Sequence, residues 1–193
     1  MLSTIAFDAA DPALVEQFFR DLPTSIDHIM VTAGRPYYGR LIDLDSAHAR
    51  RGLGEHVSPF IEVARNAADN AADKVKAGGT LIFMGGTGSR RPAIGVGIAS
   101  TVAAAVPALT ANLALELAPV RVNRIAAGFV DTQLSASLLG DELENGSQLR
   151  AKLPIRRAVQ PADVAAGAVH IMTNTALTGA TYDIDGGQQF VDA

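Results

Sequence analysis

Apolar runs of strand length alternate along this chain with longer segments in which apolar residues recur at helical spacing. The run Leu81–Met84 places four apolar residues in succession, which indicates a strand covered on both faces, as in a parallel sheet. The alternation of strands and helices predicts an α/β fold, a doubly wound parallel sheet with helices on both faces. Because no linker or repeat interrupts the pattern, residues 1–193 are expected to form a single domain.

Turn and capping residues set the expected element boundaries. The predicted strands are Leu2–Phe7, Ile26–Gly34, Thr80–Gly86, Arg121–Val130 and Ala180–Gly187. The predicted helices begin at Asp11-Pro12, at about Pro59, after Gly95 and at Gln160-Pro161. The second of these helices should run to Ala77 and end at Gly78-Gly79. Residues 35–54 are expected to be irregular, and the polar segment 131–157 is expected to form a flexible substrate lid.

Composition narrows the classes of function. An apolar content of 48% is sufficient for a substantial core, and a net charge of −4 without a basic run argues against a nucleic-acid partner. The chain has no cysteine, so it has neither disulfides nor thiolate metal ligands, and we expect no metal site. No apolar run reaches the roughly 20 residues of a membrane span. The N-terminal residues lack the basic start of a signal peptide, so we expect a cytoplasmic protein without a membrane partner.

Four motifs occur in the order typical of one known family. They are "DHIMVTAG" (27–34), "ALTANLALELAPVRVNRIAAGFVDT" (108–132), "QPADVAAGAVHIM" (160–172) and "TGATYDIDGG" (178–187). Through them the chain, from about Phe7 to Gly187, resembles the short-chain dehydrogenase/reductase (SDR) family. The resemblance implies a Rossmann-like sheet and hydride transfer between a carbonyl or alcohol substrate and the nicotinamide of NAD or NADP.

In the family, a serine and a tyrosine bind the substrate oxygen, and a lysine four residues after the tyrosine lowers the tyrosine pKa. By resemblance, the tyrosine position falls on Ala99 and the lysine position on Ala103. The serine position falls on Gly85 or Gly86, and the catalytic asparagine falls near His56. Since an alanine methyl has no proton to give, the family's proton transfer is not expected in this chain.

Other polar side chains near these positions were weighed as substitutes. They are the hydroxyls of Thr87, Ser89, Ser100 and Thr101 and the guanidinium groups of Arg90 and Arg91, which could bind an anionic substrate. The hydroxyls have no neighbouring base in the sequence, and the arginines are more simply solvated loop residues. His56 is more simply idle and partly exposed, while His28 and His170 are most simply structural.

For the cofactor, the resemblance places Asp8 at the adenine, Ala33 and Gly34 at the ribose side, and a third set at the nicotinamide. The third set is Gly128, Val130 and Thr132. The family's phosphate-binding motif Thr-Gly-x-x-x-Gly-x-Gly does not occur in the chain, and "GGTGS" (85–89) is interpreted as a turn. We therefore expect weak or no binding of NAD or NADP by these 193 residues.

By resemblance, the chain starts at the family's third strand, so two strand–helix units of about 50 residues are absent. The chain is then either an NAD(P)-dependent oxidoreductase that begins late, or a non-catalytic binding or oligomerisation module of this fold. A third possibility, an enzyme with relocated catalytic groups, has no support in the sequence. Alanine-rich helices in the second and third helical segments predict a homo-oligomer, a dimer or tetramer. The strand Leu2–Phe7 should either lie apart from the strand at Ile26 or pair directly with it.

Overall fold

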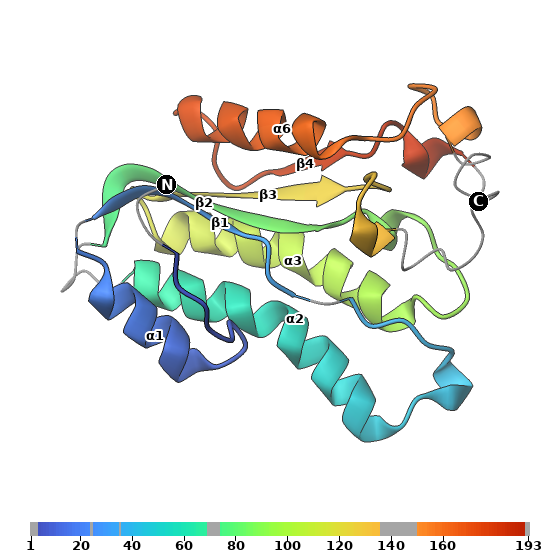
Figure 1. Ribbon diagram of the computed structural model, residues 1–193, viewed down its shortest axis with the longest axis horizontal. Coiled ribbons are helices and arrows are strands. Elements are labelled where there is room, and N and C mark those ends of the chain that lie inside the picture. Colours follow the sequence, from blue (N-terminus) through green and yellow to red (C-terminus); the bar gives the residue numbers. More distant parts are fainter. Residues whose placement is uncertain (1–3, 24, 35, 69–73, 136–149, 192–193) are drawn as a thin grey trace.

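The computed structural model describes residues 4–23, 25–34, 36–68, 74–135 and 150–191. Its sheet contains four parallel strands in the order β1-β2-β3-β4. The strands are β1 (Ile26–Val31), β2 (Val75–Gly86), β3 (Arg121–Ala127) and β4 (Thr181–Ile184). Helices cover both faces, which confirms the predicted α/β fold class (Figure 1).

The two helical layers are unequal. Three helices lie on one face, α1 (Pro12–Asp21), α2 (Ser46–Ala67) and α3 (Gly97–Glu116), and α6 (Pro161–Thr173) lies on the other (Figure 1). Strand residues alternate between the two layers. Leu81 and Phe83 pack into the cluster under α2 and α3, whereas Ile82 and Ile125 pack into the cluster under α6. The sheet is therefore sandwiched between two apolar cores, as a parallel sheet requires.

The capping signals of α1 and α6 gave correct helix starts. The Asp11 carboxylate accepts a hydrogen bond from the backbone N–H of Ala13 at 2.9 Å, and Pro12 is the first helical residue. At α6, the Asp163 carboxylate accepts from the backbone N–H of Gln160 at 2.8 Å, and Pro161 is the first helical residue. Both predicted starts are confirmed because each rests on a local hydrogen bond that the sequence makes visible.

The predicted strand at Leu2–Phe7 is wrong over the described residues 4–7, which form no strand. Residues 1–3 lie outside the described part of the chain. Phe7 stacks on Phe18 of α1 with a ring-centroid distance of 5.2 Å, so this segment packs against a helix and not beside β1. Neither expected placement of a first strand is observed, and among the described residues β1 pairs only with β2.

The predicted bounds of the second helix are also wrong. Helix α2 begins at Ser46, within the segment expected to be irregular, because the Asp45 side chain accepts from the backbone N–H groups of Ala47 and His48. Pro59 lies inside the helix, and the helix ends at Ala67. The glycines expected to end it lie in β2. A Cβ on Gly79 would come 2.5 Å from the Asp27 carbonyl oxygen, so this glycine permits close strand approach at a register shift.

Helix α3 is long and apolar enough to span a membrane by length and composition. In this fold it packs on the sheet instead, with Val102, Val106 and Thr110 buried against the core. Its remaining surface carries many exposed alanines. The helix therefore has one core-facing side and one small-residue side, as expected for a helix at the surface of a packed domain.

Candidate functional site

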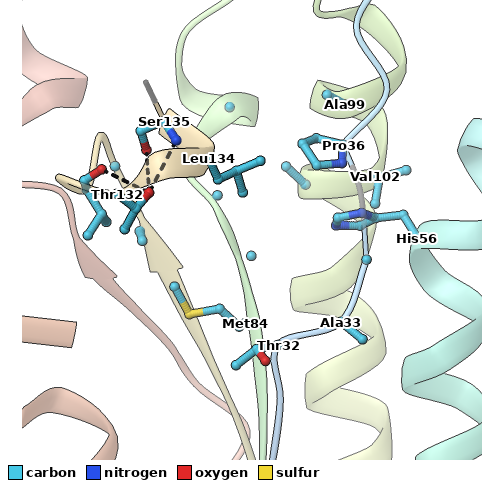
Figure 2. Close-up of a pocket in the computed structure, with 18 of the residues that line it drawn as sticks. Thr32, Ala33, Pro36, His56, Met84, Ala99, Val102, Thr132, Leu134 and Ser135 are labelled. Carbon is cyan, nitrogen blue, oxygen red and sulfur yellow. Dashed lines mark hydrogen bonds between the residues drawn. The ribbon is translucent and has the colours of Figure 1, made fainter. Parts of the chain in front are cut away.

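A pocket of about 430 Å³ opens at the carboxyl ends of β1, β2 and β3. Figure 2 shows it between the segment that carries Thr132, Leu134 and Ser135 and the helices that carry Ala99 and His56. Its lining is mostly apolar and includes Met30, Met84, Val102, Val130, Leu134 and Val164. Its volume lies in the range of about 300–1,000 Å³ typical of small-molecule sites, and the carboxyl edge of a parallel sheet is where such sites occur.

The positions singled out from the sequence meet in this pocket. Gly85, Gly86, Ala99, Ala103 and His56 all contribute to its lining. They come from three elements that are far apart in the sequence, namely β2, α3 and α2. The pocket thus brings together the four positions that the resemblance assigns to the family's catalytic residues, and at three of them this chain has alanine or glycine, which have no ionisable proton.

Available space distinguishes the two candidates for the serine position. A Cβ on Gly85 would lie 2.7 Å from the Arg124 Nη2 atom, which is closer than real contacts allow. A Cβ on Gly86 would find its nearest neighbours at 3.8 and 3.9 Å, an ordinary contact. A side chain therefore fits at Gly86 and not at Gly85 unless Arg124 moves.

His56 is half-buried beside the chain at Gly34. A Cβ on Gly34 would lie 3.2 Å from the His56 Nδ1 atom, and the φ of Gly34 is +126°, a conformation that favours glycine. The imidazole also meets the Phe60 ring edge-on, with centroids 6.0 Å apart. Glycine at position 34 thus lets the turn after β1 pass close over this imidazole.

The residues expected near the nicotinamide also line the pocket. Gly128, Val130 and Thr132 follow β3, and Ala33 and Gly34 follow β1. The Thr132 hydroxyl accepts from the backbone N–H of Ser135 at 3.2 Å, and so it fixes the turn at the pocket wall (Figure 2). Asp8 lies outside this set. It is exposed, and its carboxylate accepts from the backbone N–H of Ala10 at 2.9 Å.

Three of the polar side chains near the family positions, Ser100, Thr101 and Arg90, make other contacts. Ser100 donates to the Gly88 carbonyl oxygen at 2.9 Å, and Thr101 donates to the Gly97 carbonyl oxygen. Arg90 forms a two-point ion pair with Asp183, with distances of 2.6 and 2.9 Å. None of these residues is among the described lining of the pocket. Their positions indicate structural roles at the turn after β2.

Tyr37, Tyr38 and Arg124 are among the polar lining residues that the sequence did not indicate. Burial raises the pKa of Tyr38 above its usual value, so its hydroxyl stays protonated at neutral pH. The Tyr37 side chain packs over Gly52 of α2, where a Cβ would lie 2.9 Å from the Tyr37 Cβ atom and 3.1 Å from its Cγ atom. The pair "YY" in a polar stretch and the arginine inside the apolar strand "RVNRIAA" were the available sequence signals.

Comparison with known proteins identifies the family. A family model described as enoyl-(acyl carrier protein) reductase matches residues 2–189. The short-chain dehydrogenase/reductase ucsE of Acremonium sp is 32% identical over 164 residues, covering 84% of this chain and 61% of the relative. An uncharacterized oxidoreductase of Mycobacterium tuberculosis, MT0954, is 38% identical over 117 residues, covering 58% of this chain and 44% of the relative. The chain belongs to the short-chain dehydrogenase/reductase family, a family of NAD(P)-dependent oxidoreductases.

Solved structures agree with this assignment. A small-chain dehydrogenase in complex with NADPH superimposes with a TM-score of 0.86 at 26% identity, covering 96% of this chain and 84% of that one. The curated relatives ucsE and MT0954 are considerably longer, and the chain spans 61% and 44% of their lengths. The fold and family are therefore common to all of them, whereas the activity of the whole protein is a matter of proposal.

The small residues of the pocket fit the nicotinamide end of a dinucleotide. Gly34, Gly86 and Gly128 leave the strand ends uncovered on the pocket side. Gly128 packs closely against Gln188, because a Cβ at position 128 would come 2.5 Å from the Gln188 Oε1 atom. The described residues offer no glycine-rich phosphate loop of the family type, so the fit extends to the nicotinamide and its ribose and not to the pyrophosphate.

Proposed function

We propose that this chain forms the substrate pocket and nicotinamide wall of an SDR-type oxidoreductase fold, and that it binds a small molecule there without the family's tyrosine-based proton transfer. One observation carries the proposal. The residues that the resemblance assigns to the tyrosine, lysine and serine positions, Ala99, Ala103 and Gly85 or Gly86, all line a single, mostly apolar pocket. A pocket that keeps its shape and lacks its proton donors binds ligands but does not protonate an alkoxide.

Among the described lining residues, His56 is the one histidine, the residue type that most often acts as an acid or base. It lies on α2, at the pocket wall beside Gly34. This position supports the second candidate, an NAD(P)-dependent oxidoreductase in which His56 serves as acid or base. A non-catalytic binding module is favoured, because burial raises the pKa of Tyr38 and the described pocket lining has alanine, not lysine, at the position that the resemblance assigns to the lysine.

Turnover separates the two candidates. The chain should be incubated with NADH and NADPH and a panel of ketones and aldehydes, and cofactor oxidation should be followed by absorbance. The expected result is no oxidation above the protein-free rate. Turnover that disappears in His56→Gln and persists in a His48→Gln control would establish the oxidoreductase candidate, since His48 lies outside the described pocket lining.

Cofactor affinity is a separate test. NAD or NADP is the cofactor implied by the family, but the 193 residues supply only the nicotinamide side of its site. Weak binding is expected, because the phosphate groups of a dinucleotide are usually held by backbone N–H groups of a glycine-rich loop. Titration of NADPH, followed by nucleotide fluorescence, should give no saturation in the low micromolar range. Tight saturation would contradict this part of the proposal.

A homo-oligomer is also part of the proposal. Ala104, Ala108 and Ala111 lie on the exposed side of α3, and Leu115 on the same side is 81% exposed. Small side chains at this spacing allow two helices to approach closely. Light scattering should report a dimer or tetramer, and Ala108→Arg should shift it toward the monomer. A monomer at high protein concentration would contradict this expectation.

A further inference from the structure

Arg124 is a buried cation in the wall of the pocket. It lies on β3, it is 1% exposed, and it is among the described lining residues. Side chains alternate along a strand, so Arg124 points to the same face as Val122, which packs under α3. Its guanidinium lies against Gly85, where a Cβ would be 2.7 Å from Nη2. The guanidinium therefore occupies space that a side chain at position 85 would fill.

The hydrogen bonds of this guanidinium are incomplete. Nη2 donates to the Gly86 carbonyl oxygen at 2.9 Å, whereas Nε and Nη1 are buried and have no partner among the described residues. A buried N–H group on a charged side chain is strongly disfavoured when it lacks an acceptor. The site therefore lacks acceptors for a cation that the fold has placed there.

Neighbouring charges do not supply the missing acceptor. Asp183 on β4 is engaged by Arg90 in a two-point ion pair. The pKa of Arg124 is lowered to about 10, mainly by burial and also by the positive charge of Arg90, while the negative charge of Asp183 opposes both. Arg124 therefore remains protonated at neutral pH. Two arginines share one nearby carboxylate, which leaves an excess positive charge at the pocket wall.

We propose that Arg124 binds the carboxylate of a small apolar acid that occupies this pocket. The inference rests on the proposed function, in that the pocket must bind a small molecule. A carboxylate matches the planar guanidinium and provides oxygen acceptors for the unpartnered N–H groups. The apolar lining, with Met30, Met84 and Leu134, suits a hydrocarbon body. Among the described lining residues, Arg124 is the one lysine or arginine, so a single negative charge balances it.

The test compares matched ligands that differ in charge. Isothermal titration at pH 7 would measure the dissociation constants of 4-phenylbutanoate and of its neutral amide, together with shorter aliphatic carboxylates. The carboxylate should bind the protein about tenfold or more tightly than the amide, the usual size of a charge-assisted hydrogen bond. In Arg124→Met the preference should vanish while the amide still binds. Arg65→Met, which removes an exposed arginine on α2, should keep it.

Several outcomes would overturn the inference. Equal affinity of the protein for carboxylate and amide would do so while leaving the proposed function intact, because the pocket still binds. Binding of neither compound class would contradict both. Inorganic phosphate should not bind, and phosphate binding that exceeds that of the carboxylates and depends on Arg124 would show the wrong class of anion.

A second measurement serves if Arg124→Met does not fold. Lowering the pH below the pKa of the ligand's carboxyl group neutralises the ligand while Arg124 stays charged. The preference of the unmodified protein for the acid over the amide should then disappear. A preference that persists with the neutral acid would contradict pairing with Arg124. Arg124→Lys should retain part of the preference, because it keeps the charge and loses the planar donor pair.

Discussion

Strand β3 has a buried arginine toward each end, and the two guanidinium groups differ in how many hydrogen-bond acceptors surround them. At the amino end, Arg121 is 7% exposed, and its guanidinium donates to five carbonyl oxygens at 2.9–3.3 Å. At the carboxyl end, Arg124 is 1% exposed and donates to one carbonyl oxygen. The fold thus supplies five hydrogen-bond acceptors to the arginine at one end of the strand. It supplies one acceptor to the arginine that lines the pocket at the other end.

The acceptors explain the difference. Arg121 faces carbonyl oxygens of α6 and the turn after it, at Ile171, Met172, Asn174 and Leu177, and a fifth on β2, at Gly78. Carbonyl groups at the end of a helix lack internal partners and attract a cation. Arg124 lies in the pocket lining with Ala99, Ala103 and Gly85, which have no acceptor atom in their side chains. Burial alone therefore does not identify a functional arginine, whereas burial with missing acceptors does.

The largest effect is expected from Arg121→Met. Removal of this guanidinium takes one donor from five carbonyl oxygens, one buried and four partly buried, and the free energy of unfolding should fall by about 3–5 kcal/mol. Chemical denaturation followed by circular dichroism measures it. A loss smaller than that of an exposed-arginine control such as Arg65→Met would show that these hydrogen bonds do not support the fold.

Arg124→Met should have the opposite sign. The substitution removes a buried charge that lacks acceptors and keeps a similar shape, so the free energy of unfolding should stay unchanged or rise by about 1–4 kcal/mol. The same denaturation experiment applies. A loss comparable to that of Arg121→Met would mean that Arg124 is a structural residue, and the contrast between the two ends of the strand would fail.

Gly85→Ala tests the position of the Arg124 guanidinium in the pocket. The added methyl would lie 2.7 Å from the Arg124 Nη2 atom, so the guanidinium must shift, at a cost of about 1 kcal/mol in stability. Carboxylate affinity should fall as well. Gly86→Ala is the matched control, because its Cβ meets nothing closer than 3.8 Å. Equal effects of the two alanines on carboxylate affinity would contradict the position assigned to Arg124.

The smallest expected effect is a change in stability with pH that comes from two hydrogen-bonded carboxylates at the surface. Backbone and side-chain hydrogen bonds with His48 lower the pKa of Asp45 to about 2, and Arg157 with the Gln160 backbone lowers that of Asp163 to about 2. Because both pKa values are depressed by folding, the stability they contribute is present above about pH 4. It should be lost as the pH falls from about 4 toward 2. Asp45→Asn should flatten part of this dependence in thermal melts, and an unchanged profile would contradict it.

Local signals in the sequence predicted the parts of the fold that depend on local contacts. Asp11-Pro12 and Gln160-Pro161 mark helix starts because capping hydrogen bonds join residues two or three apart. The helix bounds predicted from Pro59 and Gly78-Gly79 are wrong, because these residues belong to elements that are stabilised by packing between residues far apart in the sequence. The apolar run Leu2–Phe7 has strand composition, yet Phe7 finds its partner on α1.

Some residues of the candidate site could also be predicted from the sequence, and others could not. Family motifs located Gly34, His56, Ala99 and Ala103, because each follows a strand end or sits on a helix at fixed spacing, and the structure brings them into one pocket. Arg124 could not be recognised as a site residue from the sequence. Its role depends on the missing side chain at Gly85, on Arg90 occupying Asp183, and on where the guanidinium points, and none of these follows from local pattern.

One measurement tests the central claim that the buried Arg124 guanidinium, which lacks hydrogen-bond acceptors for two of its nitrogens, makes this pocket a carboxylate-binding site. The free energy of unfolding of the protein and of Arg124→Met would be measured with and without the tightest-binding carboxylate at about 100 times its dissociation constant. The unmodified protein should gain about 2.7 kcal/mol from the ligand, as mass action requires. Arg124→Met, at the same ligand concentration, should gain less than about half of that. Equal stabilisation of the two proteins would contradict the account.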